Sequence, residues 1–438
     1  MVEQVVFINV RPFLARAPLA LLGLLALYCG WIGVRWGIGA TMAETAPASY
    51  AKDPTAAFES AEAAARLAPR DPFTHLMLAR LHQVSFDPEG VPRALSEYEQ
   101  AAALAPNDFL IWMEAGRARA ALGDAEGGVA ALRRAAELAP NYTQPRWHLG
   151  NALLRAGHTE EAFAELRRAA DADPMLRPQV FNLAWQVYGP NLARVVDAVG
   201  KTVESRAQLV GVLAGRGNLE DAQGVWDGLG PDGRRGQQGA ADALARALYV
   251  KGQYRRAHAV LSEGGFEGLK SEQFYDGGFE TEIAPGGRSL FGWNVTQQAG
   301  SQVAIDARGA RGGRRALRVA FGASGQVDFR NVTQVVAVEP GAHYRLSYFI
   351  KTDELRSTAT LSVTVTEGDT TLAASAPAPQ GTQDWQPVSF EFTAGPKTEA
   401  VLVRIVRVPC ADGVCPIYGK IWYDDFNLER AGGRTVAR

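Results

Sequence analysis

A spacing of 34 residues recurs in the middle of this 438-residue chain and limits what that part can fold into. Each unit holds a small residue, a glycine seven positions later, an Ala-rich segment and then a proline. A repeat of this length indicates stacked pairs of helices, each burying an apolar face against its neighbours. The residues that recur 34 positions apart are Gly116 and Gly150, Gly123 and Gly157, Leu132 and Leu166, Ala135 and Ala169, and Pro140 and Pro174.

The residue types explain the helical pairing. Two antiparallel helices approach closely only where side chains are small, so the Gly and Ala positions mark the expected crossing points. Gly123 lets the backbone turn out of the first helix, and Pro140 stops the second. Weaker copies of the pattern begin near Pro72 and continue after Pro174. We therefore predict an all-α solenoid over residues 52–262.

These units resemble the tetratricopeptide repeat, which has small residues at positions 8, 20 and 27, glycine at 15 and proline at 32. In the unit that starts at Thr143, those places hold Gly150, Ala162, Ala169, Gly157 and Pro174. In the unit that starts at Phe109, they hold Gly116, Gly128, Ala135, Gly123 and Pro140, with Trp112 at the aromatic position 4.

The resemblance implies a concave groove that is lined by the first helices and seats a peptide or a helix of a protein partner. An alternative is that several of the same residues fill contacts between repeats. The lysine that carboxylate clamps of this family use at position 5 is absent. The groove residues that the repeat pattern predicts are Phe73, Leu76, Arg80, Met113, Arg117, Trp147 and Asn151.

An uncharged stretch of 18 residues, Ala17 to Val34, lies near the N-terminus. As a helix it would cover ~27 Å, close to the thickness of a bilayer core. Arg11 and Arg16 precede it and favour a cytoplasmic N-terminus. We predict a cytoplasmic segment 1–16, a transmembrane helix 17–38 and a linker 39–51. The alternative is a cleaved signal peptide, although the sequence around Gly39–Ala43 fits a cleavage site poorly.

The N-terminus also predicts the location of the rest of the chain. Everything after residue 40 would lie outside the cytoplasm. The Ala-, Arg- and Gly-rich composition suggests a bacterium with a GC-rich genome, so we expect a single-pass inner-membrane protein with periplasmic domains.

From residue 273 the apolar period changes from helical to alternating, after a linker at 263–272. Leu361, Val363 and Val365 alternate with polar residues, and six or more such runs are separated by Gly-, Pro- or Asp-containing turns. This pattern indicates an all-β sandwich over residues 273–430, followed by a tail at 431–438. The expected fold class is therefore multidomain: a transmembrane helix, an all-α tetratricopeptide-type solenoid and an all-β jelly-roll sandwich.

The sandwich resembles the jelly-roll carbohydrate-binding modules that are appended to cellulases and xylanases. The resemblance covers nearly all of residues 273–430 and rests on short pieces in the family's order. These pieces are Asp276–Glu280, Gly292-Trp293, Gly312–Val319, Glu339–Tyr348, Asp384-Trp385 and Gly419–Phe426.

The resemblance implies a glycan site, which needs aromatic faces beside polar donors and acceptors. If Leu346, Tyr348 and Ile350 point to the core, the alternate residues of that strand share the opposite face. The candidates are Arg330, Arg345, Phe349, Lys351, Tyr418 and Trp422. The alternative is that Trp422, like Trp293 and Trp385, serves packing.

The same resemblance implies a structural calcium, held by Glu280 and by Asp424 or Asp425. The alternative is solvated carboxylates at strand ends. Asp424 and Asp425 are adjacent, so we expect their side chains to face opposite sides of the strand. No cofactor other than calcium is expected.

Cys410 and Cys415 lie five apart in a turn-like segment. A disulfide would close a small ring there in an oxidising compartment. Two unpaired thiols or half of a metal site are the alternatives.

The sequence has partial matches to catalytic motifs, and each match lacks a required residue. Gly200-Lys201-Thr202 ends like a phosphate-binding loop, but Val195 stands where the earlier glycine is required. The formal net charge of −2 gives no reason to expect nucleic acid as a partner. We expect a non-enzymatic scaffold in envelope or exopolysaccharide assembly, with a protein-only assembly factor as the alternative. A glycan-processing enzyme with a disguised α-barrel is a third reading, against which the regular repeats argue.

Overall fold

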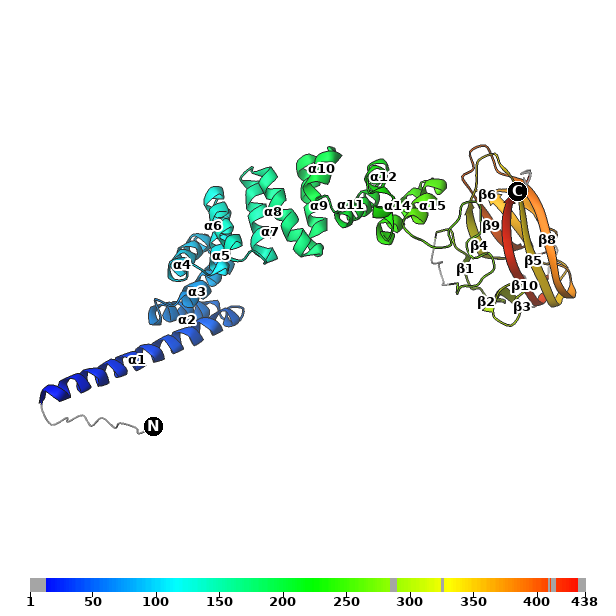
Figure 1. The fold of residues 1–438 in the computed structure, drawn as a ribbon. Coiled ribbons are helices and arrows are strands. Elements are labelled where there is room, and N and C mark those ends of the chain that lie inside the picture. Colours follow the sequence, from blue (N-terminus) through cyan, green and yellow to red (C-terminus); the bar gives the residue numbers. More distant parts are fainter. Residues whose placement is uncertain (1–12, 284–289, 324–326, 409, 411–414, 432–438) are drawn as a thin grey trace, which may run out of the picture. The chain divides into compact units, whose positions relative to one another are not determined.

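The computed structural model of this chain describes residues 13–431, apart from 284–289, 324–326, 409 and 411–414. The predicted N-terminal segment 1–16 and tail 431–438 therefore lie almost wholly outside the described residues. Two compact units are present, Met1–Gly200 and Lys201–Arg438. The first unit is all helical, and the second holds further helices and the sandwich (Figure 1). The solenoid and the all-β sandwich that the sequence predicts are both confirmed.

The first unit is built from helices that follow one another in antiparallel pairs. Its helices are α1 (Phe13–Ser49), α2 (Pro54–Leu67), α3 (Pro72–Val84), α4 (Gly90–Leu104), α5 (Phe109–Ala121), α6 (Ala125–Leu138), α7 (Thr143–Arg155), α8 (Thr159–Ala172), the 3-10 turn η1 (Pro174–Leu176), α9 (Arg177–Tyr188) and α10 (Leu192–Val199).

Local chemistry fixes where these helices begin and how closely they pair. The carboxylates of Asp53 and Asp71 accept backbone N–H groups at the starts of α2 and α3, and a proline follows each of them. A Cβ built on Gly150 would lie 2.6 Å from Cγ of Leu166 on the partner helix. The equivalent distance from Gly116 to Leu132 is 2.7 Å. Only glycine therefore fits where α5 meets α6 and where α7 meets α8.

Helix α1 corrects the prediction of a linker at 39–51. The helix continues to Ser49, and its last three turns form the first member of the first helical pair. Ala43 and Ala46 are fully buried in two apolar clusters with residues of α2 and α3. The sequence failed here because small residues in this stretch look like a linker, whereas they permit close packing.

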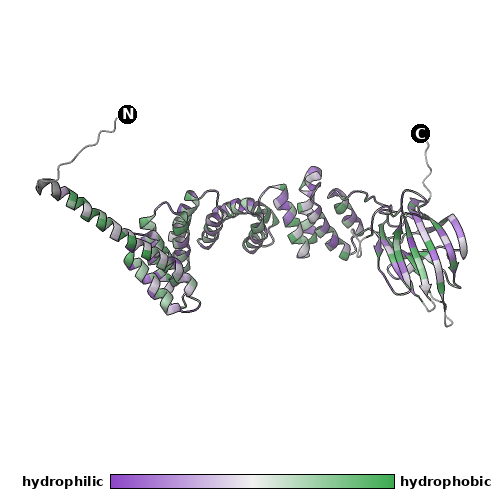
Figure 2. Ribbon diagram, turned by 90° about the horizontal axis from the view of Figure 1, so that it is seen from below, coloured by the Kyte–Doolittle hydropathy of each residue, from purple (hydrophilic) through white to green (hydrophobic). Residues whose placement is uncertain are grey.

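The N-terminal part of α1 is different. Its large apolar side chains from Leu19 to Ile38 are exposed, and this stretch is green in the hydropathy colouring of Figure 2. By length and composition α1 is the one helix among the described residues that could cross a membrane, over Pro18–Ser49. Its apolar part and its packed part form one uninterrupted helix.

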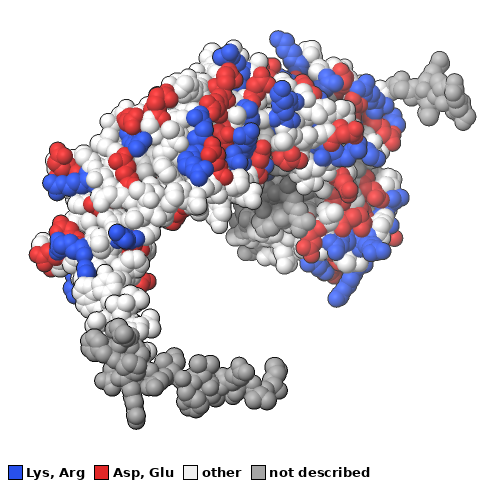
Figure 3. Space-filling model, turned by 60° about the vertical axis from the view of Figure 1, so that its left-hand side comes forward, with Lys and Arg blue, Asp and Glu red and all other residues white. Residues whose placement is uncertain are grey.

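Charged side chains cover the solenoid helices with both signs mixed, as Figure 3 shows for one face. Cross-helix ion pairs account for part of this pattern. Arg119 lies 2.8 Å from Glu99, and Arg133 lies 2.8 Å from Glu161. Such exposed pairs contribute about 0–1 kcal/mol each.

The second unit begins with two further helical pairs, α11/α12 and α14/α15, and a short α13. The bounds are α11 (Val203–Gly215), α12 (Leu219–Asp227), α13 (Gly230–Arg234), α14 (Gln238–Val250) and α15 (Tyr254–Glu263). These are the repeats whose sequence match is weak.

Two five-stranded antiparallel sheets form the sandwich. Sheet A has the order β1-β4-β9-β6-β7, and sheet B has the order β2-β3-β10-β5-β8. Alternate residues of both sheets meet in one core that includes Phe279, Leu317, Val363 and Ile405. The bounds are β1 (Asn294–Val295), β2 (Ser301–Asp306), β3 (Ala316–Ala323), β4 (Phe329–Ala337), β5 (His343–Arg356), β6 (Ser362–Glu367), β7 (Thr370–Ala374), β8 (Gly381–Thr393), β9 (Ala400–Arg407) and β10 (Ile417–Arg430).

Candidate functional site

The predicted groove residues lie on the first helices of three successive pairs, α3, α5 and α7. Phe73, Arg80, Arg117, Trp147 and Asn151 are partly or largely accessible. Arg117 forms an ion pair with Glu114 at 2.8 Å, and the amide of Asn151 donates to the carbonyl of Trp147 at 2.8 Å.

Two of the predicted groove residues are wrong. Leu76 is 6% exposed and Met113 is 3% exposed. Leu76 packs in a cluster with residues of α4 and α5, and Met113 packs with residues of α6 and α7. Both side chains fill contacts between successive pairs, which is the alternative left open by the sequence.

The predicted glycan face is largely one surface, the outer side of sheet B. Arg345, Phe349 and Lys351 alternate along β5 with the core residues Leu346, Tyr348 and Ile350. On the neighbouring β10, Tyr418 and Trp422 point the same way, and Trp422 pairs directly with Lys351.

Arg330 does not belong to this surface, and that part of the prediction is wrong. It lies on β4, which is a strand of sheet A, and its guanidinium pairs with Asp328 at 2.9 Å. Alternation within a strand was readable from the sequence, but the assignment of a strand to one of two sheets was not.

The aromatic faces on sheet B are engaged by the loop between β2 and β3. The guanidinium carbon of Arg311 lies 3.3 Å from the centroid of the Phe349 ring. The indole N–H of Trp422 donates to Asp306 at 2.9 Å, and a Cβ built on Gly309 would lie 2.8 Å from the same nitrogen. The hydrogen bond from Trp422 lowers the pKa of Asp306. A sugar ring would have to displace this loop to stack on Phe349.

The polar side chains of the same face are paired with one another. Arg345 lies 2.8 Å from Glu391, Lys351 lies 3.5 Å from Asp384, and Lys420 lies 3.1 Å from Asp353. Hydrogen bonds from Arg345 lower the pKa of Glu391. The charges of this surface therefore have partners within the domain.

The three predicted calcium ligands gather at one loop. Glu280 accepts the backbone N–H of Arg314 at 2.8 Å. Asp424, fully buried, accepts the N–H groups of Arg311 at 2.9 Å and of Gly312 at 3.2 Å. Burial raises the pKa of the Asp424 carboxyl.

The expectation that Asp424 and Asp425 face opposite sides of the strand is wrong. A bulge in β10 interrupts the alternation after Asp424, and Asp425 has a positive φ of 53°. Its side chain therefore also turns to the β2–β3 loop, where it lies 2.6 Å from the guanidinium of Arg311.

No group of three or more His, Cys, Asp or Glu side chains within the described residues is arranged to hold a metal ion. The carboxylate oxygens at the β2–β3 loop instead accept N–H groups. A structural calcium at Glu280, Asp424 and Asp425 stays a prediction.

Cys410 and Cys415 are joined by a disulfide, with their Cα atoms 5.6 Å apart. Thr358 Oγ1 lies 2.9 Å from Sγ of Cys410. The buried guanidinium of Arg407 donates to the carbonyl of Cys415 at 2.8 Å, which ties this segment to the end of β9.

The residues that sequence reasoning missed are those of the covering loop, above all Asp306, Gly309 and Arg311. Gly312 and Gly313 belong to a segment that resembles the carbohydrate-binding family. The resemblance indicated the fold but not that the β2–β3 loop would lie over Phe349. Arg311 is one of many surface arginines, so the sequence alone gave no signal for its role.

The C-terminal part of the chain matches a known family. A family described as a carbohydrate binding domain matches residues 260–411. The tRNA nuclease WapA of Bacillus subtilis is 30% identical over 166 residues, and the match covers 35% of this chain. The chain spans 7% of the length of that curated relative.

Similar solved structures cover one part of the chain each. One described as "CBM4 structure and function" is 19% identical and covers 36% of this chain and 99% of its own, with a TM-score of 0.28. YrrB, described as a TPR protein with an unusual peptide-binding site, is 17% identical over 36% of this chain and 84% of its own, with a TM-score of 0.31. Pseudomonas aeruginosa PilF is 15% identical and covers 44% of this chain and 91% of its own, with a TM-score of 0.34.

The paired helices with glycine at their crossings form a tetratricopeptide-type solenoid. The C-terminal domain resembles a carbohydrate-binding module, as the family match shows. The matched segment ends before β10, yet β10 lies between β3 and β5 in sheet B. The sandwich of this chain therefore extends to Arg430.

Proposed function

We propose that this protein is a single-pass scaffold of a bacterial inner membrane, with its solenoid and sandwich on the periplasmic side. The solenoid would hold a protein partner, and the sandwich would hold glycan, in envelope or exopolysaccharide assembly. The observation that carries the proposal is α1, in which an exposed apolar stretch continues without a break into the first packed helical pair. Such a helix fastens the adaptor directly to the bilayer.

The packing of α1 also supports an uncleaved anchor. Cleavage around Gly39–Ala43 would cut the helix where it packs. A Cβ built on Gly39 would lie 3.0 Å from Cβ of Ala68, and Ala43 is fully buried. Removal of this turn would expose an apolar face of α2, so we expect the mature protein to keep residues 17–49.

Protease protection tests the topology. The full chain, expressed in a Gram-negative bacterium with a C-terminal epitope, should be digested by protease added to spheroplasts and protected in intact cells. Mass spectrometry of the purified protein should find peptides N-terminal to Gly39. Loss of those peptides, or a C-terminus protected in spheroplasts, would contradict the anchored periplasmic scaffold.

A protein-only assembly factor is the second candidate, and one observation favours it. The aromatic ring of Phe349 on sheet B is covered by Arg311, and Trp422 is held by Asp306. If sheet B were the only glycan surface, this cover would leave no open stacking platform. Affinity electrophoresis of the full chain in polysaccharide gels separates the two candidates, because a protein-only factor migrates unchanged in every gel.

A further inference from the structure

The end of α2 and the turn into α3 lie beside the point where the apolar stretch of α1 ends. Helix α2 runs beside the C-terminal part of α1 (Figure 1). The guanidinium of Arg35, the first charged residue after the apolar stretch, donates to the carbonyl of Arg66 at 3.3 Å. One turn further along α1, a Cβ built on Gly39 would lie 3.0 Å from Cβ of Ala68. These two contacts fix the end of α2 along the axis of α1.

The length of α1 sets the depth of this contact in a bilayer. The uncharged stretch Ala17 to Val34 covers about 27 Å, close to the hydrocarbon core of about 30 Å. Lipid headgroups add about 5–8 Å on each side of that core. Arg35 and Gly39 lie about 2 Å and about 8 Å beyond Val34 along the helix. The end of α2 therefore meets α1 at the level of the headgroups.

Aromatic side chains mark the same level. Trp31 and Trp36 of α1 are exposed, and the guanidinium carbon of Arg35 lies 4.7 Å from the centroid of the Trp31 ring. Phe73, in the first turn of α3, is exposed as well. Tryptophan is enriched at the boundary between lipid and water, and arginine extends its charged group toward that boundary. Residues suited to the interface thus come from both α1 and α3.

The charges of α2 are distributed unevenly along the helix. Residues 54–63 hold two glutamates and neither lysine nor arginine. Residues 64–71, which form the end of α2 and the turn into α3, hold two arginines, Arg66 and Arg70, and a single acidic residue, Asp71. The basic end of α2 is the end that meets α1 at headgroup level.

The two arginines are available to an external partner. Arg66 contacts Glu62 at 3.4 Å, but both side chains are more than half exposed, and such a pair contributes little. Arg70 has no ion-pair or hydrogen-bond partner within the described residues. The carboxylate of Asp71 is used inside the chain, where it accepts the backbone N–H of Phe73 at 3.0 Å.

The following repeats lack both arginines. Their second helices, α4, α6 and α8, have no basic residue in the last turn. Counted from the proline that follows each helix, the position of Arg66 holds Ala103, Glu137 and Asp171, and the position of Arg70 holds Asn107, Asn141 and Met175. The packing of the repeats therefore does not require the arginines, and of these four turns the one beside α1 alone is basic.

We propose that the α2–α3 turn lies in the headgroup layer of the membrane and that Arg66 and Arg70 bind the phosphates of anionic phospholipids. The guanidinium group matches phosphate in charge and in the geometry of its N–H donors. The inference rests on the proposed membrane anchor and extends the contact from α1 to the solenoid. Lipid bound at this turn holds the first repeat against the membrane surface.

Fluorescence quenching on the full chain in liposomes tests the depth. The liposomes contain phosphatidylcholine and phosphatidylglycerol, and one of the two lipids carries a nitroxide quencher on the upper part of an acyl chain. A nitrobenzoxadiazole label on the free Cys29 reports whether α1 lies in the bilayer. In a Cys29→Ser chain, the label at Pro69→Cys should also be quenched. At Phe86→Cys, an exposed position beyond the other end of α3, it should not be quenched.

The choice of quenching lipid tests the partner. Quenching at Pro69→Cys should be stronger when phosphatidylglycerol carries the nitroxide than when phosphatidylcholine carries it. Arg66→Gln combined with Arg70→Gln should lower this preference severalfold, because each basic side chain near an anionic surface is worth about fivefold in affinity. High salt should also lower it. The matched control is Arg93→Gln combined with Arg155→Gln, which removes two exposed or partly exposed arginines of α4 and α7.

Each outcome bears on one level of the inference. Quenching at positions 29 and 69, with a preference for phosphatidylglycerol that the control variant keeps and the other variant loses, supports the assignment. Quenching at position 29 without quenching at position 69 overturns the surface contact and leaves the anchor intact. A preference at position 69 that is absent, or unchanged without Arg66 and Arg70, overturns the recognition of anionic lipid. No quenching at position 29 overturns the proposed anchor itself.

Discussion

The two outer faces of the sandwich carry similar residues, but the side chains on them are paired differently. On sheet B, arginine, lysine and tryptophan side chains are paired with carboxylates, and Arg311 covers the ring of Phe349. On sheet A, two buried threonine hydroxyls beside a pair of tyrosines have no partner within the described residues. Sheet B also holds a buried atom without a partner, Nε of Arg318, which lies opposite Trp422. The two faces therefore differ in how their aromatic and charged side chains are paired.

The pairing on sheet B determines what binding to that face would require. A ligand that binds on sheet B must first break ion pairs and displace a loop, so each gain is offset by a loss. The oxygens of Thr366 and Thr398 on sheet A are buried, so a molecule beside that sheet would not reach them. The number of aromatic, charged or unpaired groups on a face therefore does not by itself indicate a binding site.

The largest effect is expected from Asp424→Ala, which removes the anchor of the loop over sheet B. The backbone N–H groups of Arg311 and Gly312 lose their acceptor. Because each of these two unsatisfied donors costs about 1–3 kcal/mol, the free energy of unfolding of the sandwich should fall by about 2–6 kcal/mol. The change in unfolding free energy is measured by urea unfolding, monitored through hydrogen exchange in peptides of β5 and β10.

Asp353→Ala is the control for that substitution. It removes a carboxylate from the same face that pairs only with exposed Lys420. A loss of less than about 0.5 kcal/mol is expected for such an exposed pair. Equal losses in the two variants would show that the loop is not held by Asp424.

The next effect is expected on acidification, which should weaken the hydrogen bond from Trp422 to Asp306 on sheet B. The indole N–H of Trp422 lowers the pKa of Asp306 below the ordinary value of 3.8. The ionised carboxylate therefore stabilises the fold fully above pH 3.8, and this contribution is lost as the pH falls through the lowered pKa. The difference in unfolding free energy between the native chain and Asp306→Asn should be constant near neutral pH and shrink below pH 3.8. A difference that grows on acidification would contradict the assignment.

Much of the architecture could be predicted because it depends on local periodicity. The 34-residue spacing fixed which glycines meet the partner helix, and Gly116 and Gly150 lie at such crossings. Alternation along residues 345–351 fixed which side chains of β5 share a face. Both patterns can be read along the sequence, so they predict these features without knowledge of tertiary contacts.

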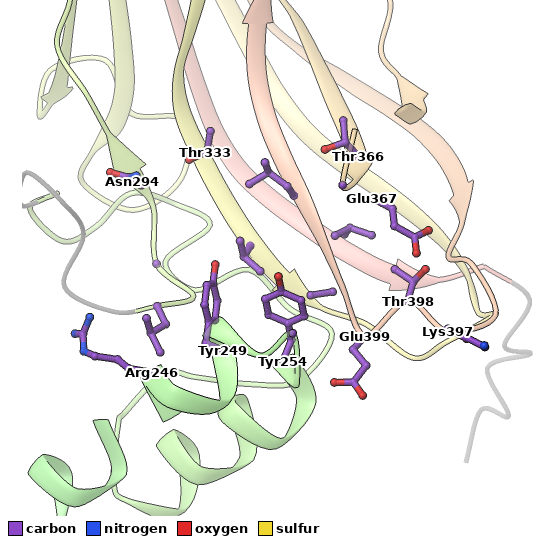
Figure 4. A pocket seen from close by; sticks show the side chains of 18 residues that line it. Arg246, Tyr249, Tyr254, Asn294, Thr333, Thr366, Glu367, Lys397, Thr398 and Glu399 are labelled. Carbon is purple, nitrogen blue, oxygen red and sulfur yellow. The ribbon is translucent and has the colours of Figure 1, made fainter. Parts of the chain in front are cut away.

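The rest depends on contacts between distant segments. Leu76 and Met113 occupy groove positions of the repeat, but the neighbouring pairs bury them. The prediction for Arg330 is wrong because its strand, β4, pairs with β9 and β1 and so belongs to sheet A. A cleft beside sheet A is lined by Tyr254, Thr366 and Thr398 (Figure 4). Both threonines are more than 100 positions from Tyr254, and no local pattern in the sequence marks the three residues.

A smaller effect is expected from Arg311→Ala, which uncovers Phe349 while leaving the loop backbone on Asp424. The variant loses one cation–π contact and one partly exposed ion pair. These should cost about 0.5–1.5 kcal/mol of unfolding free energy together. Urea unfolding of the variant and the native chain measures the difference. A loss as large as that of Asp424→Ala would show that Arg311, and not Asp424, holds the loop.

The smallest effect on stability belongs to Thr398→Val, and its sign is the informative part. The variant removes a hydroxyl that has no partner within the described residues and keeps the side-chain volume. Without ligand, the free energy of unfolding should stay the same or rise by up to about 1 kcal/mol, because a buried unsatisfied group disappears. Urea unfolding of the variant and the native chain measures the difference. A clear loss of stability without ligand would mean that Thr398 already has a partner in solution, and the contrast between the two faces would then be smaller than the structure indicates.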